Sequence, residues 1–202
     1  MSIILLAMAT IANLPHDIFG INVGQPLSYA ECPESTTDFS GKPIKHDKHY
    51  SFSYEYPKET PCYRRIKNRG TKAAFEPFER VEIDYPTPLK LGFYGATAIV
   101  NDGIVSWIYV TTLGELSQDI NLAALTEKYG KPNVFNRDAV QNGFGAKFTR
   151  ISARWDLGRG VEAEFTGFAQ DRKSGLFLLS TEFGRQEQKR RSAANLQLGR
   201  DL

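Results

Sequence analysis

The clearest hydrophobic pattern in this chain lies in residues 99–132. Within it, residues 104–112 carry apolar side chains at odd and even positions alike, which is typical of a strand buried on both faces. We therefore expect a central strand there. Side chains alternate between the two faces of a strand, so Val105 and Trp107 are expected on one face and Ile108 on the other.

A helix is predicted directly after this strand, over residues 117–129. Ser117 is a favourable N-cap residue, and Gly130 is a favourable residue to end the helix. Ile120 and Ala124 fall on a second side of this helix, so burial of more than one side is expected. The first side carries the apolar residues at helical spacing, which are Leu122, Leu125 and Tyr129.

Further strands are predicted upstream of this unit. Residues 81–85 alternate apolar and acidic side chains, and residues 89–100 form another mostly apolar segment. The pair Asp102-Gly103 then suits a tight hairpin turn that requires positive φ. Downstream, residues 133–145 are polar and contain turn signals, which indicates a loop.

Three strands are predicted near the C-terminus, at residues 150–155, 161–165 and 176–183. A register that keeps one face apolar would also bring opposite charges together on the other face. That register pairs Trp155 with Val161, Arg154 with Glu162, and Phe165 with Leu179.

These elements predict an α+β protein with a mainly antiparallel twisted sheet, one principal helix at about residues 117–129 packed on it, and a C-terminal three-strand meander. The 202 residues, of which 12% are aromatic and 24% charged, suit a single globular domain, expected over residues 13–184. Residues 185–202 form a basic tail that is expected to be a surface helix or to stay loose. The net charge of +2 is too small to indicate a nucleic-acid partner.

The N-terminus indicates export. Residues 3–11 are apolar, too short to cross a bilayer, and of the length of a signal-peptide core. Small residues suitable for cleavage follow, although no Lys or Arg precedes the apolar stretch. We interpret residues 1–12 as a signal peptide, with an upstream start or an ordinary first strand or helix as alternatives. A periplasmic or secreted protein without a transmembrane segment is expected.

The two cysteines, Cys32 and Cys62, are expected to form a disulfide if the protein is exported. The bridge would close a polar, proline-containing stretch that has little apolar content of its own. In the cytosol the two residues would remain free thiols.

No motif identifies a catalytic centre. The chain has no nucleophile elbow, no dinucleotide-binding glycine motif and no P-loop, so a non-catalytic protein without a cofactor is expected. His46 and His49 are the densest group of possible metal ligands, but a metal site needs further ligands at fixed geometry. A hydrolase or metal-dependent enzyme that uses this loop is the alternative. Glu162 and Glu164 are interpreted as a charged outer strand face rather than a catalytic pair.

The best candidate for a binding surface is the stretch 50–56, where aromatic and polar residues alternate as in a strand. Tyrosine supplies contact area at low entropy cost and is common in interface hot spots. Packing of these rings on the core is the alternative. The aromatic positions are Tyr50, Phe52, Tyr54 and Tyr56.

Together these features favour an exported protein that binds another protein, such as an inhibitor, an immunity factor or an envelope-assembly component. A further hypothesis is an envelope accessory protein whose basic tail contacts anionic lipid. The order of strand, turn, strand and helix in residues 99–132, followed by a meander, is loosely similar to small bacterial envelope proteins of α+β type. The sequence does not indicate the partner's identity or the oligomeric state.

Overall fold

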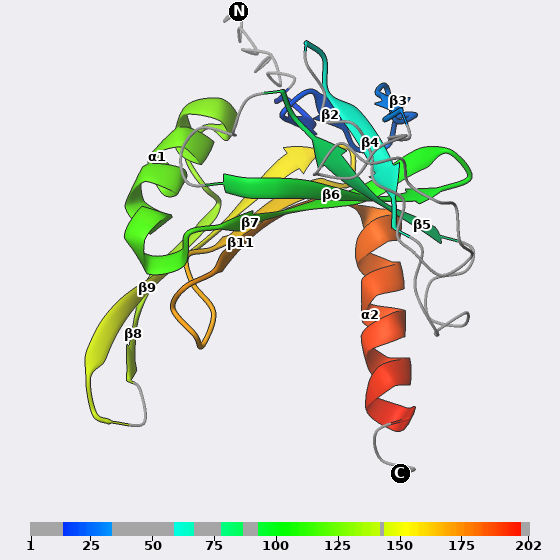
Figure 1. The fold of residues 1–202 in the computed structure, drawn as a ribbon. Helices are drawn as coiled ribbons and strands as arrows, with labels where there is room; N and C mark the ends of the chain where they lie inside the picture. The colour runs from blue at the N-terminus through cyan, green and yellow to red at the C-terminus, as the bar shows by residue number, and fades with distance from the viewer. Residues whose placement is uncertain (1–13, 34–58, 67–77, 87–92, 142–143, 199–202) are drawn as a thin grey trace, which may run out of the picture.

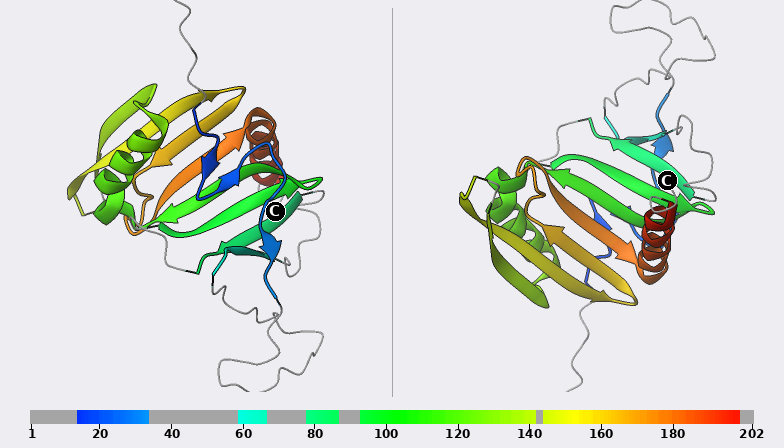
Figure 2. Two further views of the ribbon diagram at one scale, coloured as in Figure 1. Left: turned by 90° about the horizontal axis from the view of Figure 1, so that it is seen from above. Right: turned by 90° about the horizontal axis from the view of Figure 1, so that it is seen from below.

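The computed structural model of the protein describes residues 14–33, 59–66, 78–86, 93–141 and 144–198. It has the predicted α+β fold, built on a nine-stranded and mostly antiparallel sheet. Figures 1 and 2 show one long helix on each side of this sheet. A small two-stranded hairpin lies on the same side as the first of these helices.

The strand order in the large sheet is β3-β4-β5-β6-β7-β11-β10-β9-β8, and β1 and β2 form the small hairpin. The only parallel pair among the described strands is β3–β4. The strands are β1 (Asp17–Ile18), β2 (Ile21–Asn22), β3 (Ala30–Glu31), β4 (Cys62–Arg65), β5 (Phe78–Asp84), β6 (Phe93–Asn101), β7 (Ile104–Thr112), β8 (Val134–Gln141), β9 (Lys147–Gly158), β10 (Val161–Thr166) and β11 (Gly175–Thr181). The helices are the short 3-10 helix η1 (Gly114–Ser117), α1 (Gln118–Tyr129) and α2 (Glu182–Leu198).

The strands predicted before β7 are present with shifted bounds. The segment 81–85 falls mostly within β5, and the segment 89–100 overlaps β6. The turn between β6 and β7 has positive φ at Asp102 (47°) and at Gly103 (79°), as the sequence predicts.

Strand β7 is the central strand that the sequence predicts, with β6 on one side and β11 on the other. The predicted placement of Val105 on the face of Trp107 is wrong. The register between β6 and β7 shifts by one residue near Ser106, as in a β-bulge. Val105 therefore joins Ile108 in the large core cluster, whereas Trp107 lies in the smaller cluster of the opposite face.

Helix α1 packs one side on the sheet and buries Leu125 and Tyr129 there. It begins after Ser117, as predicted, but the Ser117 hydroxyl does not cap the helix. The hydroxyl instead accepts a hydrogen bond from the buried amide of Asn121 (2.9 Å). The expected burial of a second side is wrong, because Ile120 is 54% exposed.

The C-terminal meander consists of β9, β10 and β11, with β10 antiparallel to both neighbours. The predicted apolar face is confirmed, but the predicted register is wrong. Strand β9 continues to Gly158, and the chain reverses at Arg159 and Gly160, which both have positive φ. The predicted loop was longer, and the tighter turn shifts the pairing. The observed pairs are Trp155 with Ala163, Arg154 with Glu164, and Phe165 with Phe177.

Strand β8 and the beginning of α2 differ from the sequence predictions, whereas the basic tail takes the helical one of its two expected forms. The polar stretch predicted as a loop contains β8, which pairs with β9 along its whole length. The basic tail contains most of α2, which begins at Glu182, before the end of the predicted last strand. The hydroxyl of Thr181 accepts a hydrogen bond from the Gly184 N–H (3.0 Å), as an N-cap side chain does, and this explains where the strand stops and the helix begins.

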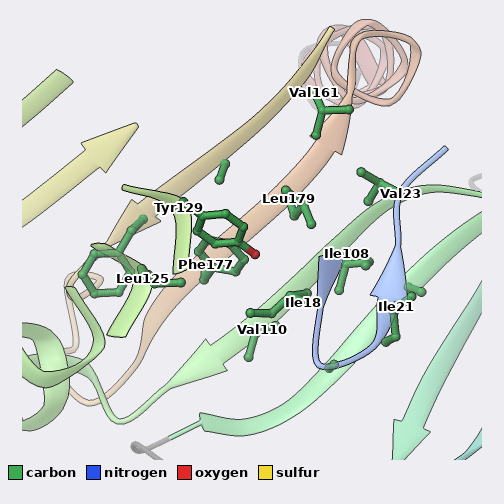
Figure 3. Packing of buried hydrophobic residues seen from close by; sticks show 14 of the residues in the cluster. Ile18, Ile21, Val23, Ile108, Val110, Leu125, Tyr129, Val161, Phe177 and Leu179 are labelled. Atoms are coloured by element: carbon green, nitrogen blue, oxygen red, sulfur yellow. The ribbon is translucent and has the colours of Figure 1, made fainter. Parts of the chain in front are cut away.

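The main core lies between the sheet and the layer formed by α1 and the β1–β2 hairpin. Figure 3 shows its side chains converging from the hairpin, from α1 and from the central strands. The opposite face carries a smaller cluster, on which α2 docks through stacking of Phe183 on Phe78 (ring centroids 6.0 Å apart). The buried members of that smaller cluster are Phe78, Ile99 and Trp107.

Candidate functional site

Strand β8 forms one edge of the large sheet. It pairs with β9 on one side, and no strand of the described chain pairs with its other side. Seven of its eight residues are exposed, and they include the apolar Val134 and Phe135. Backbone N–H and C=O groups along such a strand are available to another chain.

Helix α1 contacts this strand, and α1 and the preceding η1 both carry exposed apolar side chains. Arg137 of β8 forms an ion pair with Asp119 of α1 (2.9 Å), which holds an exposed side of the helix next to the strand. Ile120 follows Asp119 and is exposed, and Leu116 in η1 is 90% exposed. We call β8 together with Leu116, Asp119 and Ile120 the open edge.

The hairpin that presents the open edge projects past the end of β10 (Figure 1). The last β9–β10 pair is Ser152 with Thr166. Beyond it, the buried side-chain amide of Gln118 continues the ladder: its Oε1 accepts from the Ile151 N–H (3.0 Å), and its Nε2 donates to the Thr149 carbonyl (2.9 Å). Since Gln118 is the first residue of α1, the helix and the hairpin are held together as one support.

The other end of the sheet is built differently. Strand β3 has two residues and pairs with β4, and the disulfide Cys32–Cys62 joins the two segments, which confirms the predicted bridge. Arg65 of β4 forms ion pairs with Glu31 (3.3 Å) and Glu79 (2.9 Å). We call β3, β4 and this disulfide the closed edge.

Several predicted site residues lie outside the described residues. These are the candidate aromatic surface and the possible metal ligands, together with the interpreted signal peptide 1–12; all of them stay predictions. The residues concerned are Tyr50, Phe52, Tyr54, Tyr56, His46 and His49. Within the described ranges, no group of three or more His, Cys, Asp or Glu side chains is placed to hold a metal ion. None of the helices in the described ranges has the length and hydrophobicity of a membrane-spanning segment.

The two strand glutamates lie on the face that carries α2. Glu162 forms an ion pair with Arg185 of α2 (3.3 Å), not with the predicted Arg154, because the register differs. Glu164 is the residue opposite Arg154. Both positions agree with the interpretation of a charged outer face.

The arginines of α2 are largely engaged within the protein. Arg190 and Arg191 both bind the carboxylate of Glu187, at 2.6 and 2.8 Å. Hydrogen bonds from Arg190 and, to a smaller degree, from Arg191 lower the pKa of Glu187 to about 2. Arg191 also stacks over the ring of Phe78, 4.3 Å from its centroid. Together with Arg185, these contacts tie the beginning of the basic tail to the sheet.

No protein-family model, curated protein or solved structure matches this chain. The function is therefore inferred from the surface itself. Sequence reasoning did not predict β8 as a strand, because Asn136, Arg137 and Asp138 give this stretch a polar centre. The remaining signal was the pair of apolar residues at each end, Val134-Phe135 and Ala139-Val140.

Proposed function

We propose that this protein is a non-catalytic, exported protein that binds an extended segment of another protein by strand addition to β8. The observation that carries the proposal is the long exposed side of β8, which no described strand pairs. In strand addition, main-chain hydrogen bonds supply affinity, and alternate side chains supply specificity.

The side chains of β8 define what the added strand would meet. Arg137 faces α1 through its ion pair with Asp119, so Phe135, two residues earlier, lies on the same face. A partner strand with an apolar residue beside Phe135 would cover that ring and approach the exposed Ile120. Burying these side chains would add apolar contact to the main-chain hydrogen bonds.

Export is supported by the Cys32–Cys62 disulfide, because structural disulfides persist mainly in oxidising compartments. The interpreted signal peptide is in accord with this location. An inhibitor, an immunity factor or an envelope-assembly component would each bind another protein in such a compartment.

The test uses the full chain as bait in an envelope extract, followed by reconstitution with the purified partner. We expect a complex of fixed stoichiometry in which the β8 amides become protected from hydrogen exchange. Phe135→Lys should weaken binding by about tenfold or more, because it removes an apolar contact next to the added strand. Leu176→Lys is the matched control, since Leu176 of β11 is 42% exposed and Phe135 is 46% exposed.

Three outcomes would contradict the proposal. A complex in which the β8 amides remain unprotected would overturn strand addition. Protection that arises in the protein alone, and grows with its concentration, would identify a second copy as the occupant of the edge. The absence of any stoichiometric partner would overturn the binding function.

A further inference from the structure

A cavity of about 390 Å³ lies between the β8–β9 hairpin and the loop that connects β10 to β11. Strand β9 contributes Phe148 and Arg150 to its wall, and the loop contributes Phe168, Gln170 and Arg172. The cavity thus combines two aromatic rings with two guanidinium groups. Guanidinium groups bind carboxylates and phosphates, and flat rings accept flat apolar ligands.

Arg172 is a fixed part of this wall. Its guanidinium stacks on the ring of Phe148, 3.3 Å from the centroid, and binds the carboxylate of Glu115 through Nε (2.9 Å) and Nη2. The Glu115 N–H in turn donates to the Arg172 carbonyl (3.1 Å). Side-chain and backbone contacts therefore hold the cation and the ring in one arrangement before any ligand arrives.

Arg150 supplies charge that the described protein does not neutralise. It lies directly opposite Asp138 in the β8–β9 register, where opposite charges commonly pair. No ion pair within the described ranges involves Arg150, and its side chain lines the cavity instead. The cavity therefore has a guanidinium group available for a negatively charged ligand.

Two of the acidic groups near the cavity, Glu115 and Asp171, already have partners within the protein. Glu115 is bound to Arg172, as described above. The carboxylate of Asp171 turns back into its own loop and accepts hydrogen bonds from the Ser174 and Lys173 N–H groups, which lower the pKa of Asp171. Asp138 is the acid that remains opposite Arg150, and it should oppose anion binding.

We propose that this cavity binds a small anionic ligand, a carboxylate or phosphate group carried on a flat apolar ring. Arg150 would bind the oxyanion, and the ring would lie among Phe148, Phe168 and the guanidinium of Arg172. Val140 and Gln141 of β8 also line this cavity. Strand addition would use the main-chain groups of β8 rather than the anion-binding side chain of Arg150, so either proposal can fail without the other.

The first test compares benzoate and phenyl phosphate with neutral benzamide, each titrated into the full-length protein and followed by the backbone amide NMR signals. With the anions we expect saturable shifts at residues 148–150 and 168–172. Benzamide should bind at least about tenfold more weakly, because the charge-assisted hydrogen bonds are lost. Preference for one anion would identify the oxyacid. Equal binding of benzoate and benzamide, or shifts spread over the whole surface, would overturn the proposal.

The second test uses variants. Arg150→Gln should weaken anion binding by about tenfold, whereas Asp138→Asn should strengthen it. Arg137→Gln is the control in the same hairpin, because Arg137 binds Asp119 and does not line the cavity. Unchanged affinity in Arg150→Gln, with the amide spectrum otherwise preserved, would exclude Arg150 as the anion-binding group.

Discussion

The two edges of the large sheet are stabilised in opposite ways. At the closed edge, β3 has two residues, a disulfide links it to β4, and ion pairs join β4 to its neighbours. At the open edge, β8 has eight residues and depends on β9, on the Arg137–Asp119 ion pair and on the Gln118 amide beneath the hairpin.

This difference distinguishes an edge that is protected against pairing from an edge that is stable and also exposed to a partner. Short strands and charges are common ways for proteins to prevent edge-to-edge pairing, and the closed edge has both. The open edge is long and carries exposed apolar side chains. Its hairpin is nevertheless held by the buried hydrogen bond from the Ile151 N–H to Gln118. A strand that is held on one side and has no described partner on the other is suited to recognition, because binding does not require it to become ordered first.

The largest expected effect comes from removing the disulfide of the closed edge. Replacing both Cys32 and Cys62 with Ser should lower the free energy of unfolding by about 3–4 kcal/mol, because the cross-link joins residues 30 positions apart and restricts the unfolded chain. Urea denaturation of the double variant and of the oxidised wild type measures the difference. A loss below about 1 kcal/mol would mean that ion pairs and packing, rather than the cross-link, maintain this edge.

At the open edge, Gln118→Ala should lower the free energy of unfolding by about 1–3 kcal/mol, because it leaves the Ile151 N–H and the Thr149 carbonyl without their partner. The same denaturation experiment, with hydrogen exchange at the Ile151 amide, tests this. Asp119→Ala is the control at the next position; its exposed ion pair is worth at most about 1 kcal/mol. Equal losses in the two variants would show that Gln118 has no special role in supporting the hairpin.

Lowering the pH tests the docking of α2 independently of the two sheet edges. The folded-state pKa of Glu187 is about 2, below its ordinary value of 4.5, so its contribution is complete above about pH 4.5 and is lost as the pH falls towards 2. Because solvent screens the exposed Arg190, we expect the ionised Glu187 to contribute about 1 kcal/mol or less to the free energy of unfolding. Urea midpoints of Glu187→Gln and wild type should converge in this pH window; parallel curves would contradict the assignment.

The smallest expected effect is at the surface of β8. Phe135→Ser should change the free energy of unfolding by less than about 0.5 kcal/mol, because the ring is already partly in solvent. Tyr63→Ser at the closed edge is the comparison, and it should cost more because Tyr63 packs against the core. Equal costs in thermal or urea denaturation would mean that the Phe135 ring is a structural residue of the open edge.

At the closed edge the sequence predicts the disulfide but not strands β3 and β4. Two cysteines in a chain with an apolar N-terminus have one simple pairing, and that disulfide is present. Strand β8 of the open edge lies in a stretch that the sequence predicts as a loop, because an exposed edge strand has no buried face to impose an alternating apolar pattern. Residues 50–56, where the sequence placed the binding surface, lie outside the described structure.

The sequence by itself determined the elements whose signals are local. These are the fold class, the central strand β7, the positive-φ turn at Asp102-Gly103, and the end of α1 at Gly130. Tertiary structure alone decided the register of β10, the face of Val105, the partner of Glu162 and the existence of β8. The physical reason is that periodicity and backbone preference act within a few residues, whereas register, bulges and edges depend on which distant strand lies alongside.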